Sequence, residues 1–143
     1  MFIGEYSYSI DSKGRLAVPK KFRSALLKGA VITRGLDSCL FLYTKKEWEE
    51  IARKLSSLPM SQKNTRAFSR LMLAGAMDVS LDKQGRITIP EYLRTYAGIV
   101  KSSVIAGLYS RLEIWDEKKW STYKAETEKQ SEEIAEQLSE LGV

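Results

Sequence analysis

The chain has 143 residues, 43% of them hydrophobic and 29% charged, and no apolar run approaches the roughly 20 residues of a membrane-spanning helix, so we expect a folded cytoplasmic protein without a membrane partner. It contains no histidine and one cysteine, Cys39, which excludes an intrachain disulfide and a metal cage built from these residues, and we expect no metal or other cofactor. The net charge of +5 is uneven, because residues 116–143 carry four lysines against eight acids while residues 1–115 carry +9, and a basic body favours a polyanionic partner.

The first part of the chain predicts a hairpin followed by short elements. Tyr6–Ile10 and Leu16–Val18 alternate with a period of two, and the turn between them contains Gly14, which can adopt a positive φ. Asp11 is well suited to accept backbone N–H bonds across this turn, and Pro19 suits the first position of a helix. We expect a short helix and two further strands over residues 20–27, 31–33 and 39–43.

Two helices are predicted next. The capping-box pattern Thr44–Glu47 opens a helix that runs to about Leu58 and ends at Pro59. A second helix is expected over residues 61–73. Three methionines of this region are expected to fill the core: Met60, Met72 and Met77.

Residues 9–23 recur as residues 80–94 without a gap, at a constant offset of 71. The identical pairs are Ser9 and Ser80, Asp11 and Asp82, Gly14 and Gly85, Arg15 and Arg86, Pro19 and Pro90, and Arg23 and Arg94. After a one-residue insertion the match continues from Gly35 with Gly107 to Trp48 with Trp120. The chain is therefore predicted to be two similar units with the same order of elements.

The last part of the chain predicts one long amphipathic helix from Glu117 on. Apolar or small side chains recur every seven residues at Trp120, Thr127, Ile134 and Leu141. This helix packs either on its own body or on a neighbouring subunit. The expected organisation is a first unit over residues 5–47, a helical linker over 48–75, a second unit over 76–119 and the C-terminal helix over 120–143.

Two copies of an Asp-x-x-Gly-Arg turn, each followed by a proline and a further arginine, resemble the SpoVT/AbrB-type swapped-hairpin domains, and their tandem arrangement resembles the MraZ family. The resemblance runs from Phe2 to about Trp120, and it includes the start Met1–Tyr6 and the segment Arg70–Ala76. It implies an α+β fold, in which hairpins of the two units interleave into a pseudo-symmetric β-rich body with flanking helices and a long C-terminal helix.

The resemblance also implies a function. Members of this family are sequence-specific transcriptional regulators that bind short direct repeats of double-stranded promoter DNA upstream of their own operon, a cluster for cell division and wall synthesis. For this chain we expect repression of that operon, a closed ring of identical subunits and association with the nucleoid. The resemblance centres the DNA contacts on the two turns.

The chemistry of the turns suits this function. We expect Arg15 and Arg86 to read guanine, because a guanidinium offers paired donors to O6 and N7. Four lysines are expected near phosphates: Lys13, Lys20, Lys21 and Lys83. The predicted DNA-binding set is thus Lys13, Gly14, Arg15, Lys20, Lys21, Lys83 and Arg86, whereas Asp11, Asp82 and Gly85 shape the turns. Gln84 stands where the first turn has Lys13, so the first turn is the more basic.

Alternatives remain open at this stage. Arg15 could pair with Asp11 and only shape the hairpin, and Arg23 and Arg94 are expected to bond carbonyls or acids near the short helix. A protein-interaction or antitoxin-like module is the main alternative function. We do not expect an enzyme or a small-molecule substrate, because Cys39 has no histidine to activate it and no phosphate-binding glycine-rich motif is present.

Overall fold

The computed structural model describes all residues from 1 to 143 as an α+β fold with two antiparallel sheets, as expected. The larger sheet has six strands in the order β1 (Phe2–Ser9), β7 (Ser102–Tyr109), β8 (Leu112–Asp116), β4 (Leu40–Thr44), β3 (Ala30–Arg34) and β5 (Met77–Val79). The smaller sheet pairs β2 (Arg15–Ala17) with β6 (Arg86–Thr88).

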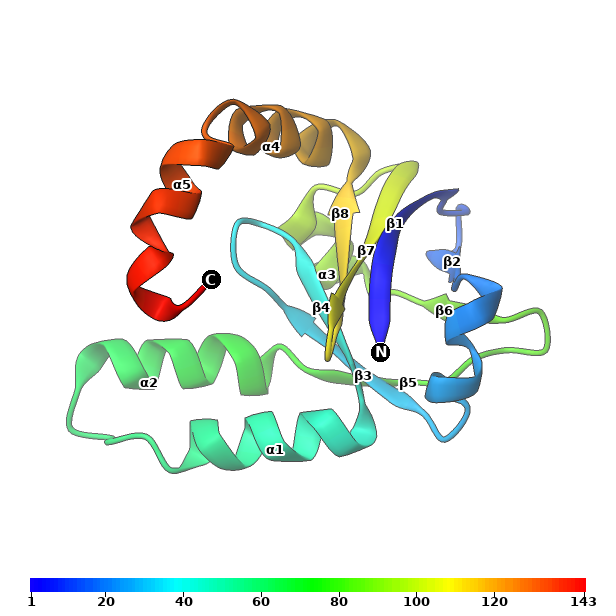
Figure 1. Ribbon diagram of the computed structural model, residues 1–143. Helices are drawn as coiled ribbons and strands as arrows, with labels where there is room; N and C mark the ends of the chain where they lie inside the picture. The colour runs from blue at the N-terminus through cyan, green and yellow to red at the C-terminus, as the bar shows by residue number, and fades with distance from the viewer.

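The two halves of the chain interleave in the larger sheet (Figure 1). Strand β1 of the first half pairs with β7 of the second, and β5 of the second half pairs with β3 of the first. Strands β4 and β8 meet at the centre. Each strand on one side of the sheet therefore has its equivalent from the other half at the same place on the other side: β1 and β5 at the edges, β7 and β3 next to them, and β8 and β4 at the centre. This arrangement confirms the expected pseudo-symmetric interleaving of the two halves.

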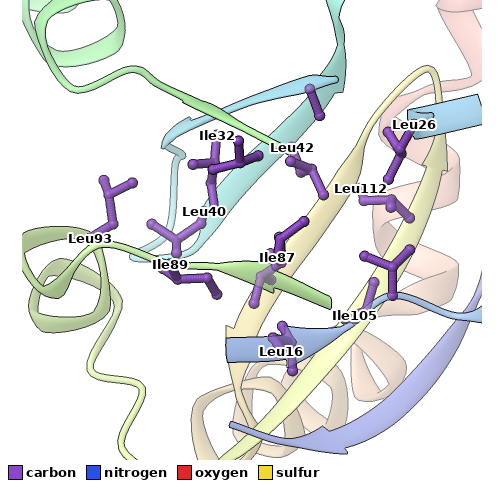
Figure 2. Packing of buried hydrophobic residues seen from close by; sticks show 14 of the residues in the cluster. Leu16, Leu26, Ile32, Leu40, Leu42, Ile87, Ile89, Leu93, Ile105 and Leu112 are labelled. Atoms are coloured by element: carbon purple, nitrogen blue, oxygen red, sulfur yellow. The ribbon is translucent and has the colours of Figure 1, made fainter. Parts of the chain in front are cut away.

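The prediction of a local hairpin was wrong in its pairing. A turn does reverse the chain after Asp11, but β1 and β2 pair with strands of the other half and not with each other. A two-stranded hairpin with a three-residue strand is unstable in isolation. The observed β2–β6 pair instead places Leu16 opposite Ile87, and these side chains, 0% and 1% exposed, enter the main core (Figure 2).

The larger sheet separates two apolar clusters. Strand β4 shows this with a period of two, since Leu40 and Leu42 belong to the main core while Phe41 and Tyr43 belong to a second cluster. The main core also receives residues from both halves, as Figure 2 shows for the strands that carry Leu16 and Leu112. Each half therefore depends on the other for burial of its apolar side chains.

The helices lie outside this sheet (Figure 1). They are α1 (Lys45–Ser56), α2 (Lys63–Ser69), α3 (Glu91–Ala97), α4 (Glu117–Lys129) and α5 (Ser131–Gln137). A π-helical turn, Arg70–Ala74, extends α2. The expected start of α1 is confirmed, because Thr44 Oγ1 accepts a hydrogen bond from Glu47 N at 3.2 Å. None of these helices combines the length and the apolar character needed to cross a bilayer.

Two helix predictions were wrong in detail. Residues 20–27 form two 3-10 turns, Lys20–Phe22 and Ser24–Leu26, whereas the equivalent α3 is α-helical. Helix α3 has Glu91 in its first turn and ends at Gly98 with φ of +67°, and the first half lacks such an acid. The single C-terminal helix is broken at Gln130, and α5 restarts with two acids in its first turn.

Two sequence assignments were also wrong. Of the methionines expected in the core, Met72 is buried, but Met60 and Met77 are 80% and 42% exposed. Met60 lies in the connection between α1 and α2, where no strand or helix covers it.

The match of Gly35 with Gly107 was the other wrong assignment. Arg34 pairs with Leu40 at the end of β3, and Gly107 pairs with Leu112 at the same place in β7. Because the β7–β8 turn is one residue shorter than the β3–β4 turn, Gly107 is the structural equivalent of Arg34 and not of Gly35.

Candidate nucleic-acid interface

Each Asp-x-x-Gly-Arg turn is closed by its own carboxylate. Asp11 Oδ1 accepts hydrogen bonds from Lys13 N at 3.0 Å and Arg15 N at 2.8 Å. Asp82 Oδ1 accepts from the N atoms of Gln84 and Arg86, both at 2.9 Å. The backbone of the two turns therefore has the same hydrogen-bonded geometry, as expected for a short acidic side chain at the start of a turn.

These hydrogen bonds keep both carboxyl groups ionised. The backbone N–H of Arg15 is the main cause that lowers the pKa of Asp11 below its usual value, and the guanidinium of the same residue adds to it. The backbone N–H of Arg86 lowers the pKa of Asp82 in the same way. Each turn thus holds a permanent negative charge beside its arginine.

The carboxylates bind the arginines through one nitrogen only. Arg15 Nε donates to Asp11 Oδ2 at 2.6 Å, and Arg86 Nε donates to Asp82 Oδ2 at 2.8 Å. Arg86 Nη1 also lies 3.9 Å from Asp11 Oδ2, whereas the Nη atoms of Arg15 have no partner within the chain. Since a guanidinium is a rigid fork, fixing Nε fixes the direction of the remaining donors.

The fold brings the two turns together. Val18 N donates to Gly85 O at 3.0 Å, and Ile89 N donates to Gly14 O at 2.8 Å, so each turn is bonded to the chain that follows the other. In the β2–β6 ladder Arg15 lies opposite Thr88 and Ala17 lies opposite Arg86. Because side chains alternate along a strand, both arginines lie on the face opposite the buried Leu16 and Ile87.

The second pair of repeated arginines has a structural role, as predicted. Arg23 Nε donates to Val18 O and Arg94 Nε donates to Ile89 O, both at 3.0 Å. Each also covers the turn glycine of the other half: Gly14, with φ of +79°, lies beneath Arg94, and Gly85, with φ of +76°, lies beneath Arg23. The sequence alone did not predict that the arginine of each half contacts the turn glycine of the other half, although the shared 71-residue offset of these glycines and arginines was a signal for it.

The lysines of the predicted set are distributed unequally. Lys13 and Lys83 are exposed at the tips of the turns, and Lys20 is exposed on the 3-10 turn that follows β2. Lys21 Nζ lies 5.1 Å from the ring centroid of Tyr6 and 5.2 Å from that of Phe22, a cation–π arrangement directed toward β1. The structure therefore groups Lys13 and Lys83 with the turn arginines but does not bring Lys21 to them.

This surface offers donors and positive charge rather than reactive groups. No three His, Cys, Asp or Glu side chains are grouped as metal ligands. The Cys39 thiol is buried in the second cluster, and burial raises its pKa to about 12, so it is not a thiolate at neutral pH. Free guanidinium and ammonium donors on one outward face suit phosphates and base edges.

Comparison with known proteins extends over the whole chain. The family model described as "MraZ protein, putative antitoxin-like" matches twice, over residues 1–71 and 72–141. A relative named "Transcriptional regulator MraZ", from Acetivibrio thermocellus, is 48% identical over 143 residues, which is the full length of both chains. The two matches follow one another as the repeated turns do.

Proposed function

Because the chain belongs to the MraZ family, we propose that it is a transcriptional regulator that binds promoter DNA through its paired turns, residues 11–15 and 82–86. The observation that carries this proposal is the presence of two arginines, each held at Nε by an ionised aspartate, on one outward face. The name of the relative supports the regulatory role, and the geometry supports the site.

The arginines read bases in this proposal. The Nη atoms of Arg15 donate to O6 and N7 of a guanine in the major groove, while Asp11 holds Nε and sets the direction of the fork. Arg86 acts in the same way but is also drawn toward Asp11. If Arg15 only shaped the turn, it would bind Asp11 through the same Nε contact, so this contact does not distinguish the two roles. The Nη atoms, which have no partner within the chain, are the observation that favours base reading.

The lysines supply affinity that does not depend on sequence. Lys13 and Lys83, at the turn tips, and Lys20 bind phosphates and fix the register of the protein on the duplex. Lys21 contributes mainly through its charge, because its ammonium group lies over two aromatic rings. Each turn carries one lysine, Lys13 in the first and Lys83 in the second, so both turns bind the DNA backbone.

The assembly multiplies a weak contact. One pair of turns reaches few bases, so specificity requires several subunits, held in a ring, to engage neighbouring direct repeats together. The chain then occupies a promoter upstream of its own division and cell-wall operon, represses it, and remains associated with the nucleoid. It acts by binding and not by catalysis.

Fluorescence anisotropy tests the proposal. The chain is titrated with a duplex from upstream of its own gene and with a scrambled duplex of the same composition, across a salt series. We expect a preference for the native duplex that weakens with salt. Arg15→Ala should lose most of this preference, whereas the control Lys46→Ala, on the exposed face of α1, should retain it. Equal binding to both duplexes at every salt concentration would contradict the proposal.

One observation favours a second candidate function. The description of the matching family includes the word "antitoxin-like", which suits a module that binds another protein. Such a module would form a stable complex with one cellular protein that survives high salt, and Arg15→Ala would leave that complex intact. A preference for native DNA that Arg15→Ala removes would argue against it.

A further inference from the structure

Helices α1 and α2 enclose an open apolar groove that the turns do not use. Its volume is about 210 Å³, and the apolar residues that line it are Leu55, Leu58, Met60 and Leu73. The shape of the groove is fixed by hydrogen bonds, since Arg66 Nη1 donates to Met60 O at 2.9 Å and Ser69 Oγ donates to Leu55 O at 3.3 Å. Met60 at its rim is 80% exposed, so the apolar lining of the groove extends to the surface.

The groove lies in a strongly basic part of the chain. Residues 51–77 contain no aspartate or glutamate and five cationic residues: Arg53, Lys54, Lys63, Arg66 and Arg70. Two of them, Arg66 and Arg70, line the groove directly. A ligand for this site therefore needs an apolar face with acids beside it.

The C-terminal arm, residues 131–141, has these properties. Ile134 lies in α5, Leu138 caps its C-terminus and Leu141 ends the 3-10 turn Ser139–Leu141 that follows. These three apolar side chains are 37%, 38% and 74% exposed. The whole stretch from residue 125 to 143 carries six glutamates and one lysine. The arm thus carries exposed apolar side chains with acids around them, the complement of the groove in both respects.

Neither surface is used within one chain. Every residue of α5 is exposed, and the main contacts of α5 are with α4 before it and the 3-10 turn after it. Helix α4 is fixed to the body, because Lys124 Nζ donates to Glu5 Oε1 at 2.6 Å and Lys119 Nζ donates to Ala97 O at 3.1 Å. These anchors hold α4, from which the arm continues, on the body of the protein.

We propose that the C-terminal arm of one subunit binds the groove between α1 and α2 of a second copy of the chain. Such a contact joins two different surfaces, so a bound pair still offers one free arm and one free groove, and repetition gives a ring when the rotation between neighbours closes. In Figure 1 the arm, α1 and α2 lie on the side away from β2 and β6, which leaves the paired turns free. The inference deepens the assembly part of the proposed function and does not depend on the DNA contact.

Charge reversal tests the contact. One variant carries Arg70→Glu in the groove and Lys63→Glu at the start of α2, and the other carries Glu136→Lys and Glu140→Lys in the arm. All four residues are exposed and none of these side chains has a hydrogen-bond partner in the structure. An acid near the start of α2 and a base near the end of α5 also agree with the helix dipoles, so the variants should fold, as circular dichroism will show.

Size-exclusion chromatography with light scattering gives the mass of each assembly. We expect the wild-type chain to form a closed oligomer, each variant alone to fall to a smaller species, and their equimolar mixture to regain a larger mass. The control Lys28→Glu, at an exposed site far along the chain from both surfaces, should keep the wild-type mass. The replacement of both Ile134 and Leu138 by serine should also reduce the mass, by removing the apolar part of the contact.

Three results would overturn the inference: a wild-type chain that is monomeric at all concentrations, charge variants that keep the wild-type mass, or a mixture that does not regain mass. Anisotropy with a duplex that carries a single repeat separates this failure from that of the proposed function. The charge variants should keep the wild-type preference for one repeat and lose the added affinity for several. If the wild-type chain formed an oligomer but showed no preference for any repeat, the proposed DNA reading would fail and the proposed contact between arm and groove would stand.

Discussion

The two turns have the same backbone and the same net charge, because each contains one Asp, one Lys and one Arg, but they place the lysine differently. The expectation that the first turn is the more basic was therefore wrong, since Lys83 offsets the replacement of Lys13 by Gln84. Both aspartates accept the same two backbone N–H bonds and the Nε of the arginine that follows. However, Arg86 has two carboxylates within 4 Å, whereas Arg15 has one, and Gln84 replaces Lys13. Asp, Gly and Arg therefore determine the shape of the turn, while the neighbouring positions determine where the lysine lies.

The turn glycines should show the largest difference between the halves. A Cβ at position 14 would lie 2.8 Å from Ile89 O, a backbone atom, whereas the three atoms nearest to a Cβ at position 85 all belong to the side chain of Arg23, which can shift more readily than backbone. Both positions have positive φ, which alone costs a non-glycine residue about 1–2 kcal/mol. We expect Gly14→Ala to lower the free energy of unfolding by about 2–4 kcal/mol and Gly85→Ala by about 1–2 kcal/mol.

Urea unfolding measures both values. Gly142→Ala is the matched control, because its φ is +80° but no atom lies within 4 Å of the added Cβ. Equal losses for Gly14→Ala and Gly85→Ala would show that the backbone contact to Ile89 is not what distinguishes the two turns.

The arginines should differ next, and in DNA binding. Arg15→Ala should reduce the preference for native over scrambled duplex by about 1–3 kcal/mol, a loss of roughly 5-fold to 150-fold. Arg86→Ala should cost less, because its guanidinium is shared between Asp82 and Asp11. Anisotropy titrations at one salt concentration compare the two. A loss for Arg15→Ala that is equal on both duplexes would rule out base reading by this residue.

Exchange of the third turn position should have a smaller effect. Lys13→Gln should weaken binding to all duplexes alike and reduce the slope of log affinity against log salt by about 1. Gln84→Lys should do the opposite, because it adds a second cation to a turn that already carries Lys83. If these variants changed the preference between duplexes and not the salt slope, these positions would be contacting bases.

The smallest effect is expected from pH. The pKa of Asp11 and that of Asp82 are lowered in the fold from 3.8, so their contribution to stability is present above that value and is lost as the pH falls through the folded pKa. Asp11→Asn should therefore lower the free energy of unfolding at neutral pH slightly and flatten its decrease below about pH 4. Thermal unfolding from pH 2 to 7 measures this. An unchanged profile would show that the carboxylate of Asp11 contributes no more to stability than the asparagine amide that replaces it.

The sequence predicted local chemistry better than strand pairing. The 71-residue repeat identified both turns, and the side-chain chemistry of Thr44 and Arg23 predicted contacts that the structure contains. The partner of β2 was missed, because alternation shows that a segment is a strand but not which strand it joins. Only the family resemblance indicated that the hairpins interleave.

The rest depended on features that a short pattern does not carry. The exposure of Met60 follows from the α1–α2 connection, which leaves a groove that composition alone does not reveal. The break at Gln130 has no proline or glycine, although Ser131 followed by two glutamates is a common helix start and was a usable signal. The predicted roles of the turn residues in DNA binding stay predictions.

The central claim is that the paired turns read guanine through arginine. Its most direct test is anisotropy binding of the wild-type chain and Arg15→Ala to native repeats in which each guanine in turn is replaced by 7-deazaguanine, which lacks the N7 acceptor. We predict one or more positions at which the replacement weakens the wild-type chain but not Arg15→Ala, because the lost contact is the same. If every replacement weakened both proteins equally, Arg15 would not be the residue that reads guanine.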